Sequence, residues 1–136
     1  PENGSGFGGF LQLKFALSCT MDIESLQALC KSFPLVTEDV KWGADLCFSI
    51  GGKMFLVTNP DQLPVGASFK CTSEEFEVLI ARPGFKPAPY LARHQWVYVE
   101  DITLMNGSEW QHFVEQSYQL VKAKLPKKVL KDLGIL

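Results

Sequence analysis

The chain has 136 residues, of which 46% are hydrophobic and 21% are charged, and its formal net charge is −2. This length is that of one ordinary domain, and the composition is too apolar for a disordered chain. The apolar runs fall well short of the ~20 residues that a transmembrane helix needs. The small net charge also argues against a strongly basic nucleic-acid-binding protein.

The charges are unevenly distributed along the chain. Residues 119–136 contain five lysines and one aspartate, a net charge of +4, whereas residues 1–118 contain eight basic and fourteen acidic residues, a net charge of −6. Two interpretations stay open. Lysines near helix ends complement the helix dipole and keep a surface soluble. Alternatively, the basic C-terminus attracts a partner that carries phosphate groups.

The first twenty residues differ from the rest of the sequence. Residues 1–9 are rich in Gly, Ser and Asn, which is typical of a flexible linker, and the chain does not begin with Met. We predict that residues 1–20 are an appended or upstream-translated extension and that residues 21–136 form a single domain. The alternative is an added strand, because apolar residues alternate at positions 11, 13, 15 and 17.

The domain is predicted to begin with a helix that Asp22 caps and that ends before Pro34. The clearest local signal follows at Gly51-Gly52, a two-residue hairpin turn between strands at 46–50 and 53–58. This turn would pair Phe48 with Phe55 and Leu46 with Val57, on a face that packs against helices. The preceding residues 37–45 form a polar stretch that carries Trp42 and Gly43, to which no strand is assigned.

The sequence pattern in the second half of the chain predicts three more strands and three helices. Strands are expected at 67–71, 90–92 and 95–101, with 85–89 extended. Thr72 with Glu75, and Ser108 with Gln111, are spaced as capping boxes that begin helices, and Pro126 begins a short basic helix. The order α-β-β-β-α-β-β-α, followed by the C-terminal helix, predicts a two-layer α+β domain with an antiparallel sheet.

The sequence contains no motif for catalysis or metal binding. The cysteines are not spaced as metal ligands, so we expect free thiols in a reducing cytoplasm; they are Cys19, Cys30, Cys47 and Cys71. His112 is expected to be solvated, and His94 is either a turn residue or part of a binding surface. No nucleophile elbow, phosphate-binding loop or HExxH motif is present. We therefore predict a protein that is not an enzyme and has no cofactor.

Several short motifs, in this order, resemble the MmcQ/YjbR-like family of small bacterial proteins over residues 21–136. They are Phe33-Pro34-x-Val36-Thr37-Glu38, Phe48-x-Ile50-Gly51-Gly52-Lys53-Met54-Phe55, Phe69-Lys70-Cys71, Pro87-Ala88-x-Tyr90, His94-x-Trp96-Val97 and Ser117-Tyr118-x-Leu120-Val121-x-x-Lys124-Leu125-Pro126-Lys127-Lys128. The resemblance implies a secretion-chaperone-like α+β fold, also described as a double-wing arrangement. It also implies a role in DNA binding, which has been proposed for the family on structural grounds, and no enzymatic activity is established for the family.

Carried onto this sequence, the resemblance implies a binding surface for nucleic acid or another ligand. The positions that match the family's recurrent polar and aromatic residues are Lys53, Lys70, Tyr90, Arg93, His94, Trp96, Lys124, Lys127 and Lys128. Cations would neutralise phosphates while aromatic rings stack on exposed bases. We predict a monomeric, cytoplasmic, non-catalytic protein that binds DNA or another nucleic acid and no membrane. The alternative is a module that binds another protein or a small ligand.

Overall fold

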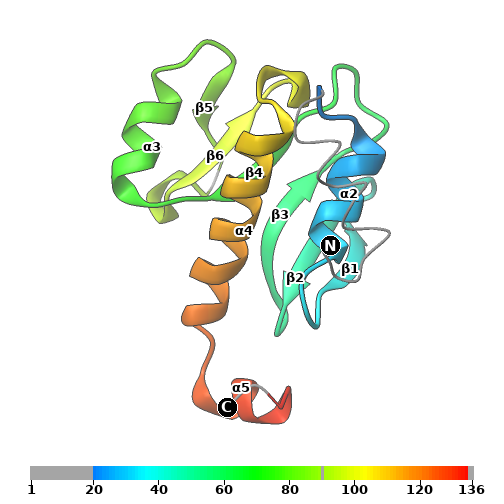
Figure 1. The fold of residues 1–136 in the computed structure, drawn as a ribbon, viewed down its shortest axis with the longest axis vertical. Helices are drawn as coiled ribbons and strands as arrows, with labels where there is room; N and C mark the ends of the chain where they lie inside the picture. The colour runs from blue at the N-terminus through cyan, green and yellow to red at the C-terminus, as the bar shows by residue number, and fades with distance from the viewer. Residues whose placement is uncertain (1–19, 90, 135–136) are drawn as a thin grey trace.

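A six-stranded antiparallel sheet forms the centre of the molecule, with the order β1-β2-β3-β4-β6-β5 (Figure 1). The structure is a computed structural model, and it describes residues 20–89 and 91–134. The strands are β1 (Thr37–Lys41), β2 (Asp45–Ile50), β3 (Lys53–Thr58), β4 (Ala67–Lys70), β5 (Phe85–Pro87) and β6 (Trp96–Val99).

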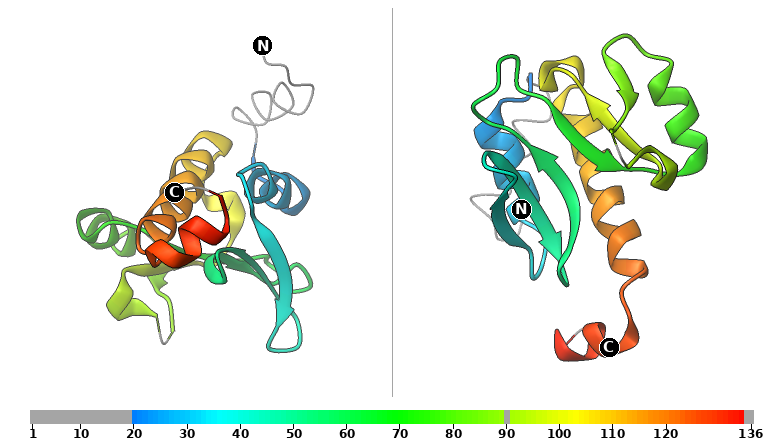
Figure 2. Two further views of the ribbon diagram at one scale, coloured as in Figure 1. Left: turned by 90° about the horizontal axis from the view of Figure 1, so that it is seen from below. Right: turned by 180° about the vertical axis from the view of Figure 1, so that it is seen from behind.

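The helices lie on one face of this sheet (Figure 2). They are α2 (Ile23–Lys31), α3 (Ser73–Ile80), α4 (Gly107–Ala123) and α5 (Lys127–Asp132), with short 3-10 helices η1 (Ala92–His94) and η2 (Ile102–Leu104). The long α4 crosses β3 and β4, and α2 and α3 flank it on either side. The predicted two-layer α+β class is therefore confirmed. No helix in the described part of the chain has the length and apolar character to cross a bilayer.

Aromatic side chains fill the space between α4 and the sheet. The Tyr118 ring stacks on Phe33 with centroids 4.9 Å apart, and Phe113 stacks on Phe69 at 5.4 Å. Trp110 is fully buried and donates its indole N–H to the Ile102 carbonyl oxygen at 2.7 Å. Buried aromatic residues contribute large apolar areas, so this layer dominates the hydrophobic stabilisation of the domain.

The predicted helix starts at Asp22 and Thr72 are confirmed. The Ser25 N–H donates to Asp22 Oδ1 at 2.7 Å, and the Glu75 N–H donates to Thr72 Oγ1 at 3.2 Å. The predicted Ser108–Gln111 capping box is wrong. Asn106 and Glu109 form the box two residues earlier, because Asn is as good an N-cap as Ser and the helix already begins at the buried Gly107.

The Gly51-Gly52 hairpin forms as predicted, but its register shifts. Ser49 pairs with Met54 as expected, whereas Phe48 pairs with Leu56 rather than Phe55. The extra residue is a β-bulge, which reverses the faces of all residues beyond it. Leu56 is therefore buried in the core beside Phe55. Val57, predicted to pack against the helices, lies on the opposite face and lines a pocket there.

Two further expectations differ from the structure. Residues 37–41, to which no strand was assigned, form the edge strand β1, paired with β2. Its mostly exposed, charged residues suit an edge that must avoid pairing with other chains, and they hide the usual apolar alternation. The strand predicted at 90–92 is wrong, because Ala92 begins η1 and the sixth strand is β5 at 85–87. The predicted extension 1–20 lies outside the described residues, apart from Thr20, which bridges to Asn106.

Candidate ligand-binding pocket

The face of the sheet turned away from α2 and α4 is covered by none of the described α-helices (Figure 2, right). Val57, Ser68 and Tyr98 are direct register partners across β3, β4 and β6. Directly paired residues point to the same side of a sheet, so these three form a continuous floor. Each of them is half-buried.

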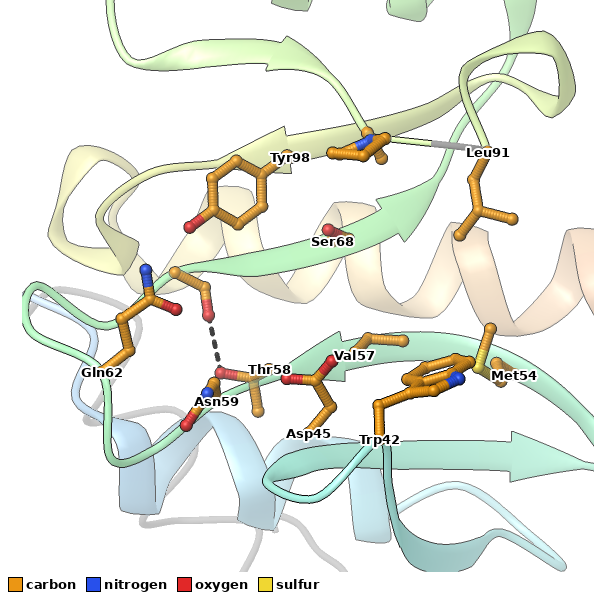
Figure 3. Close-up of a pocket in the computed structure, with 13 residues that line it drawn as sticks. Trp42, Asp45, Met54, Val57, Thr58, Asn59, Gln62, Ser68, Leu91 and Tyr98 are labelled. Carbon is orange, nitrogen blue, oxygen red and sulfur yellow. Dashed lines mark hydrogen bonds between the residues drawn. The ribbon is translucent and has the colours of Figure 1, made fainter.

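Three connections rise around this floor and make it a pocket (Figure 3). The β1–β2 turn supplies Trp42 and the first residue of β2, Asp45. The β3–β4 connection contributes Asn59 and Gln62, and the connection from β5 to η1 completes the wall with Ala88, Pro89 and Leu91. The volume of the pocket is about 520 Å³. Pockets of this size that are mostly apolar with a few placed polar groups are typical of small-molecule sites.

Trp42 is held in an unusual conformation at the edge of the pocket. Its φ is +51°, in the left-handed region, and the following Gly43 has φ +88°. A bulky residue in this region costs roughly 1–3 kcal/mol of backbone strain. The side chain is also 69% exposed, so burial does not offset the strain. Positive φ at both residues is what the tight turn between β1 and β2 requires. The turn accepts a tryptophan where glycine would be unstrained, and strained positions of this kind concentrate at functional sites.

Asp45 brings the charge to the pocket. Among the described residues, its carboxylate is in no ion pair, and Lys41, its register partner on β1, does not come within ion-pair distance. Figure 3 shows the carboxylate between the Trp42 ring and the Thr58 and Asn59 side chains. The Thr58 hydroxyl is occupied, since it donates to the Gly66 carbonyl oxygen at 2.7 Å. Asp45 therefore remains available to a ligand.

Four residues of the sequence-predicted site gather beside η1, but two of them are buried. Trp96 is 5% exposed and Lys70 is 8% exposed, and they are register partners on β6 and β4. The Lys70 ammonium donates to the carbonyl oxygen of His94 at 2.6 Å. Arg93 is exposed and donates from Nε to the His94 ring at 3.4 Å. Trp96 thus packs within the fold and presents no free ring for a base to stack on.

The chemistry of Lys70 and Cys71 follows from their burial. Desolvation lowers the pKa of Lys70, and the like charge of Lys124 lowers it further. Burial, assisted by Glu75, raises the pKa of the neighbouring Cys71 to about 12 despite the Lys70 charge. The thiol is therefore protonated at neutral pH and is a poor nucleophile. The free cysteines in the described part of the chain, Cys30, Cys47 and Cys71, are all buried.

The other predicted lysines belong to segments that meet where the β2–β3 turn approaches α5. The Gly51 turn, which precedes Lys53, lies against Leu125 and Val129, so Lys53, Lys124, Lys127 and Lys128 surround one end of the domain. The predicted residues thus lie partly beside η1 and partly near α5, with Lys70 and Lys124 close enough for their charges to interact, and Tyr90 lies outside the described residues. No group of three or more His, Cys, Asp or Glu side chains in the described chain could hold a metal ion.

The sequence prediction missed the pocket because its residues come from segments far apart in the chain. One signal was present: a Trp-Gly pair in a polar stretch, where a large apolar side chain has no periodic partner. This signal is weak, because single exposed apolar residues are common on protein surfaces. The β-bulge that turns Val57 toward the floor has no comparable signal in the sequence.

The architecture defines a small α+β domain in which a helix-backed antiparallel sheet carries a ligand-sized pocket on its open face. The YjbR family model matches residues 31–120, and the chain belongs to this family. A crystal structure of Deinococcus radiodurans protein DR2400, whose domain is DUF419, superposes with a TM-score of 0.75 at 25% identity, covering 86% of this chain and 91% of that one. No curated protein matches the sequence.

A second solved structure supports the same fold. The crystal structure of a protein from Pseudomonas syringae superposes with a TM-score of 0.61 at 19% identity, and the match covers 74% of this chain and 99% of that chain. At this identity the similarity bears on the fold alone. It indicates that the helix-backed sheet is common to proteins of divergent sequence.

Proposed function

We propose that this protein is a non-catalytic binding protein that holds a small organic ligand on the open face of its sheet. The observation that carries the proposal is the strained, exposed Trp42 beside a pocket of about 520 Å³. A fold that keeps an indole ring out of its core at a cost in stability is expected to recover that cost when the ring covers a ligand.

The residues of the pocket favour binding over catalysis. The described lining contains no Cys, His or Lys, so it offers no thiol, imidazole or amine to act as nucleophile or base. Asp45 is its single carboxylate, whereas two-carboxylate mechanisms need a second group whose pKa differs. The raised pKa of Cys71 also argues against covalent chemistry from the adjacent strand end.

Titration with indole, a neutral aromatic probe, tests this function. Two-dimensional NMR of the full chain should show shifts concentrated at pocket residues, with a dissociation constant of about 0.1–1 mM for so small a compound. Ser68→Phe fills the floor and should abolish these shifts, whereas Ser108→Phe on the exposed side of α4 should not. If neither indole nor phenol shifts any pocket residue, the proposed function is wrong.

A second candidate function, nucleic-acid binding, is favoured by the lysines near α5. Lys53, Lys124, Lys127 and Lys128 surround the end where the Gly51 turn meets Leu125, and phosphate contacts by lysines need no aromatic partner. Fluorescence anisotropy with labelled single- and double-stranded DNA at two salt concentrations tests it. Lys127→Ala with Lys128→Ala should reduce the salt dependence, whereas Lys86→Ala should leave it unchanged. Absence of binding at low salt and tens of micromolar protein would remove this candidate.

A further inference from the structure

We propose that the ligand is a flat aromatic compound carrying a positively charged amine. This inference rests on the proposed pocket function and adds the chemical class of the ligand. It follows from two properties of the pocket: an aromatic ring on its wall and another on its floor, and a single carboxylate in its lining.

The aromatic residues come from distant strands and border the same space. Trp42 lies on the β1–β2 turn and Tyr98 on β6, on opposite sides of the pocket, with Ser68 on the floor between them (Figure 3). Met54 lies next to the Trp42 ring, and thioethers pack well against aromatic faces. A planar ring that enters this space meets apolar or aromatic surfaces on both sides, which is the arrangement that stacking requires.

The charge of the pocket selects against anions. Asp45 is the only lining residue in the described chain that is charged at neutral pH. A carboxylate next to an indole face attracts a cation by charge and by the ring quadrupole together, and both act more strongly away from bulk water. On the same side of the pocket, the Gln62 amide oxygen can accept from an ammonium group, whereas Asn59 Oδ1 already accepts from the Asp61 N–H at 3.1 Å.

The nearest lysines do not supply this positive charge themselves. The Lys86 ammonium lies 5.5 Å from the centroid of the Tyr98 ring and pairs with Glu100 at 3.0 Å, so its charge is balanced outside the pocket. Its position indicates that the electron-rich face of Tyr98 accepts a cation. Lys41 is opposite Asp45 in the register but is not paired with it. The Asp45 carboxylate is therefore left to a cation brought by the ligand.

Three probes that share one ring system test the proposal at pH 7: tryptamine, a cation; indole, which is neutral; and indole-3-acetate, an anion. We expect tryptamine to bind about 5- to 10-fold tighter than indole, and indole-3-acetate to bind more weakly than indole. Asp45→Asn should remove the advantage of tryptamine and leave indole affinity within about twofold. Asp61→Asn, which removes a charge from the exposed β3–β4 connection without touching the lining, should keep that advantage.

The outcomes separate this inference from the function on which it rests. If all three probes bind with similar affinity, or if indole-3-acetate binds best, the cationic class is wrong while the pocket function stands. If none of the three binds, both are wrong. The comparison among the three probes uses the unaltered protein. It therefore tests the predicted charge of the ligand even if Asp45→Asn fails to fold.

Discussion

The imidazole Nε2 of His112 on α4 lies 3.0 Å from Oε2 of Glu75 on α3, so this hydrogen-bonded contact ties the two helices together across the surface. The sequence places these residues 37 positions apart. His112 is exposed, as predicted, but its contact with Glu75 was not predicted. Glu75 is also the third residue of α3, where a carboxylate complements the helix N-terminus.

This pair predicts a dependence of stability on pH. Burial by itself would raise the pKa of Glu75, but hydrogen bonds from His112, Gln116 and Thr72 outweigh it and lower the pKa below 4.5. A carboxyl with a lowered pKa stabilises the fold above its unfolded pKa, and the contribution disappears as pH falls through the folded value. Glu75→Gln should therefore cost about 0.5–1 kcal/mol at pH 6, since the pair is partly exposed.

The measurement is urea unfolding of both proteins between pH 3 and pH 6. The difference in unfolding free energy should shrink below pH 4.5 and vanish at the acidic end. Glu77→Gln, an exposed neighbour on the same helix, is the control and should show no such trend. A Glu75→Gln effect that stays constant across this range would show that the charge is not its origin.

Substitution of Ser117 should lower the unfolding free energy more than substitution of Glu75, although only one hydroxyl group is removed. Its hydroxyl accepts from the Lys70 N–H at 3.0 Å and donates to the Phe55 carbonyl oxygen at 2.5 Å, linking α4 to β4 and β3. The residue is fully buried, so Ser117→Ala leaves two backbone groups without partners or water. We expect a loss of about 2–3 kcal/mol in unfolding free energy.

Denaturant unfolding measures this loss. The dependence of the unfolding free energy on denaturant concentration should be the same in the variant and in the unaltered protein. Ser108→Ala, on the exposed start of the same helix, should change stability by less than about 0.5 kcal/mol. Equal effects of the two substitutions would mean that the Ser117 hydroxyl is not a structural link.

Local chemistry explains which elements could be predicted. Asp22 and Thr72 mark helix starts because the side-chain oxygen of each accepts a hydrogen bond from the backbone N–H three residues further on. This interaction is local in sequence and can therefore be predicted from spacing. The Gly51-Gly52 turn is equally local, because both residues need positive φ. The register beyond the turn depends on the bulge at Phe55, which is set by packing against α4 rather than by nearby residues.

The candidate site was less predictable for the same reason. Trp96 resembles a stacking residue in sequence, yet the register with Lys70 and the η1 segment bury it. Trp42, Asp45 and Tyr98 become neighbours only when the sheet forms, so no spacing in the sequence connects them. The lysines near α5 are predictable as a basic segment, because they are contiguous in the chain.

Two substitutions of Trp42 should differ in their stability and yet both lose ligand binding. Trp42→Ala keeps a side chain at φ +51°, whereas Trp42→Gly relieves the strain at that position. The glycine variant should therefore be about 1 kcal/mol more stable than the alanine variant, and both should lose indole binding. Thermal unfolding and NMR titration of the two variants check this. A glycine variant less stable than the alanine variant would contradict the assignment of strain to this residue.

The two glycines of the β2–β3 turn should respond differently to the same substitution. Both have positive φ, at +60° for Gly51 and +82° for Gly52, so an alanine at either position costs about 1 kcal/mol in strain. A Cβ on Gly52 meets nothing, but a Cβ on Gly51 would lie 2.7 Å from Leu125 Cδ1. Gly51→Ala should therefore cost about 1 kcal/mol more than Gly52→Ala, because the buried Leu125 must shift.

A double-mutant cycle isolates this contact between the turn and the residues after α4. In a Leu125→Ala background the closest contact is gone and only Val129 Cγ1, at 3.0 Å, stays close to the added Cβ. The excess cost of Gly51→Ala over Gly52→Ala should therefore largely disappear, while the cost of positive φ remains at both positions. Urea unfolding of the four combinations measures the coupling. An excess that persists without the leucine side chain would place its origin in the turn itself, and the close approach of the turn to Leu125 would then contribute nothing to stability.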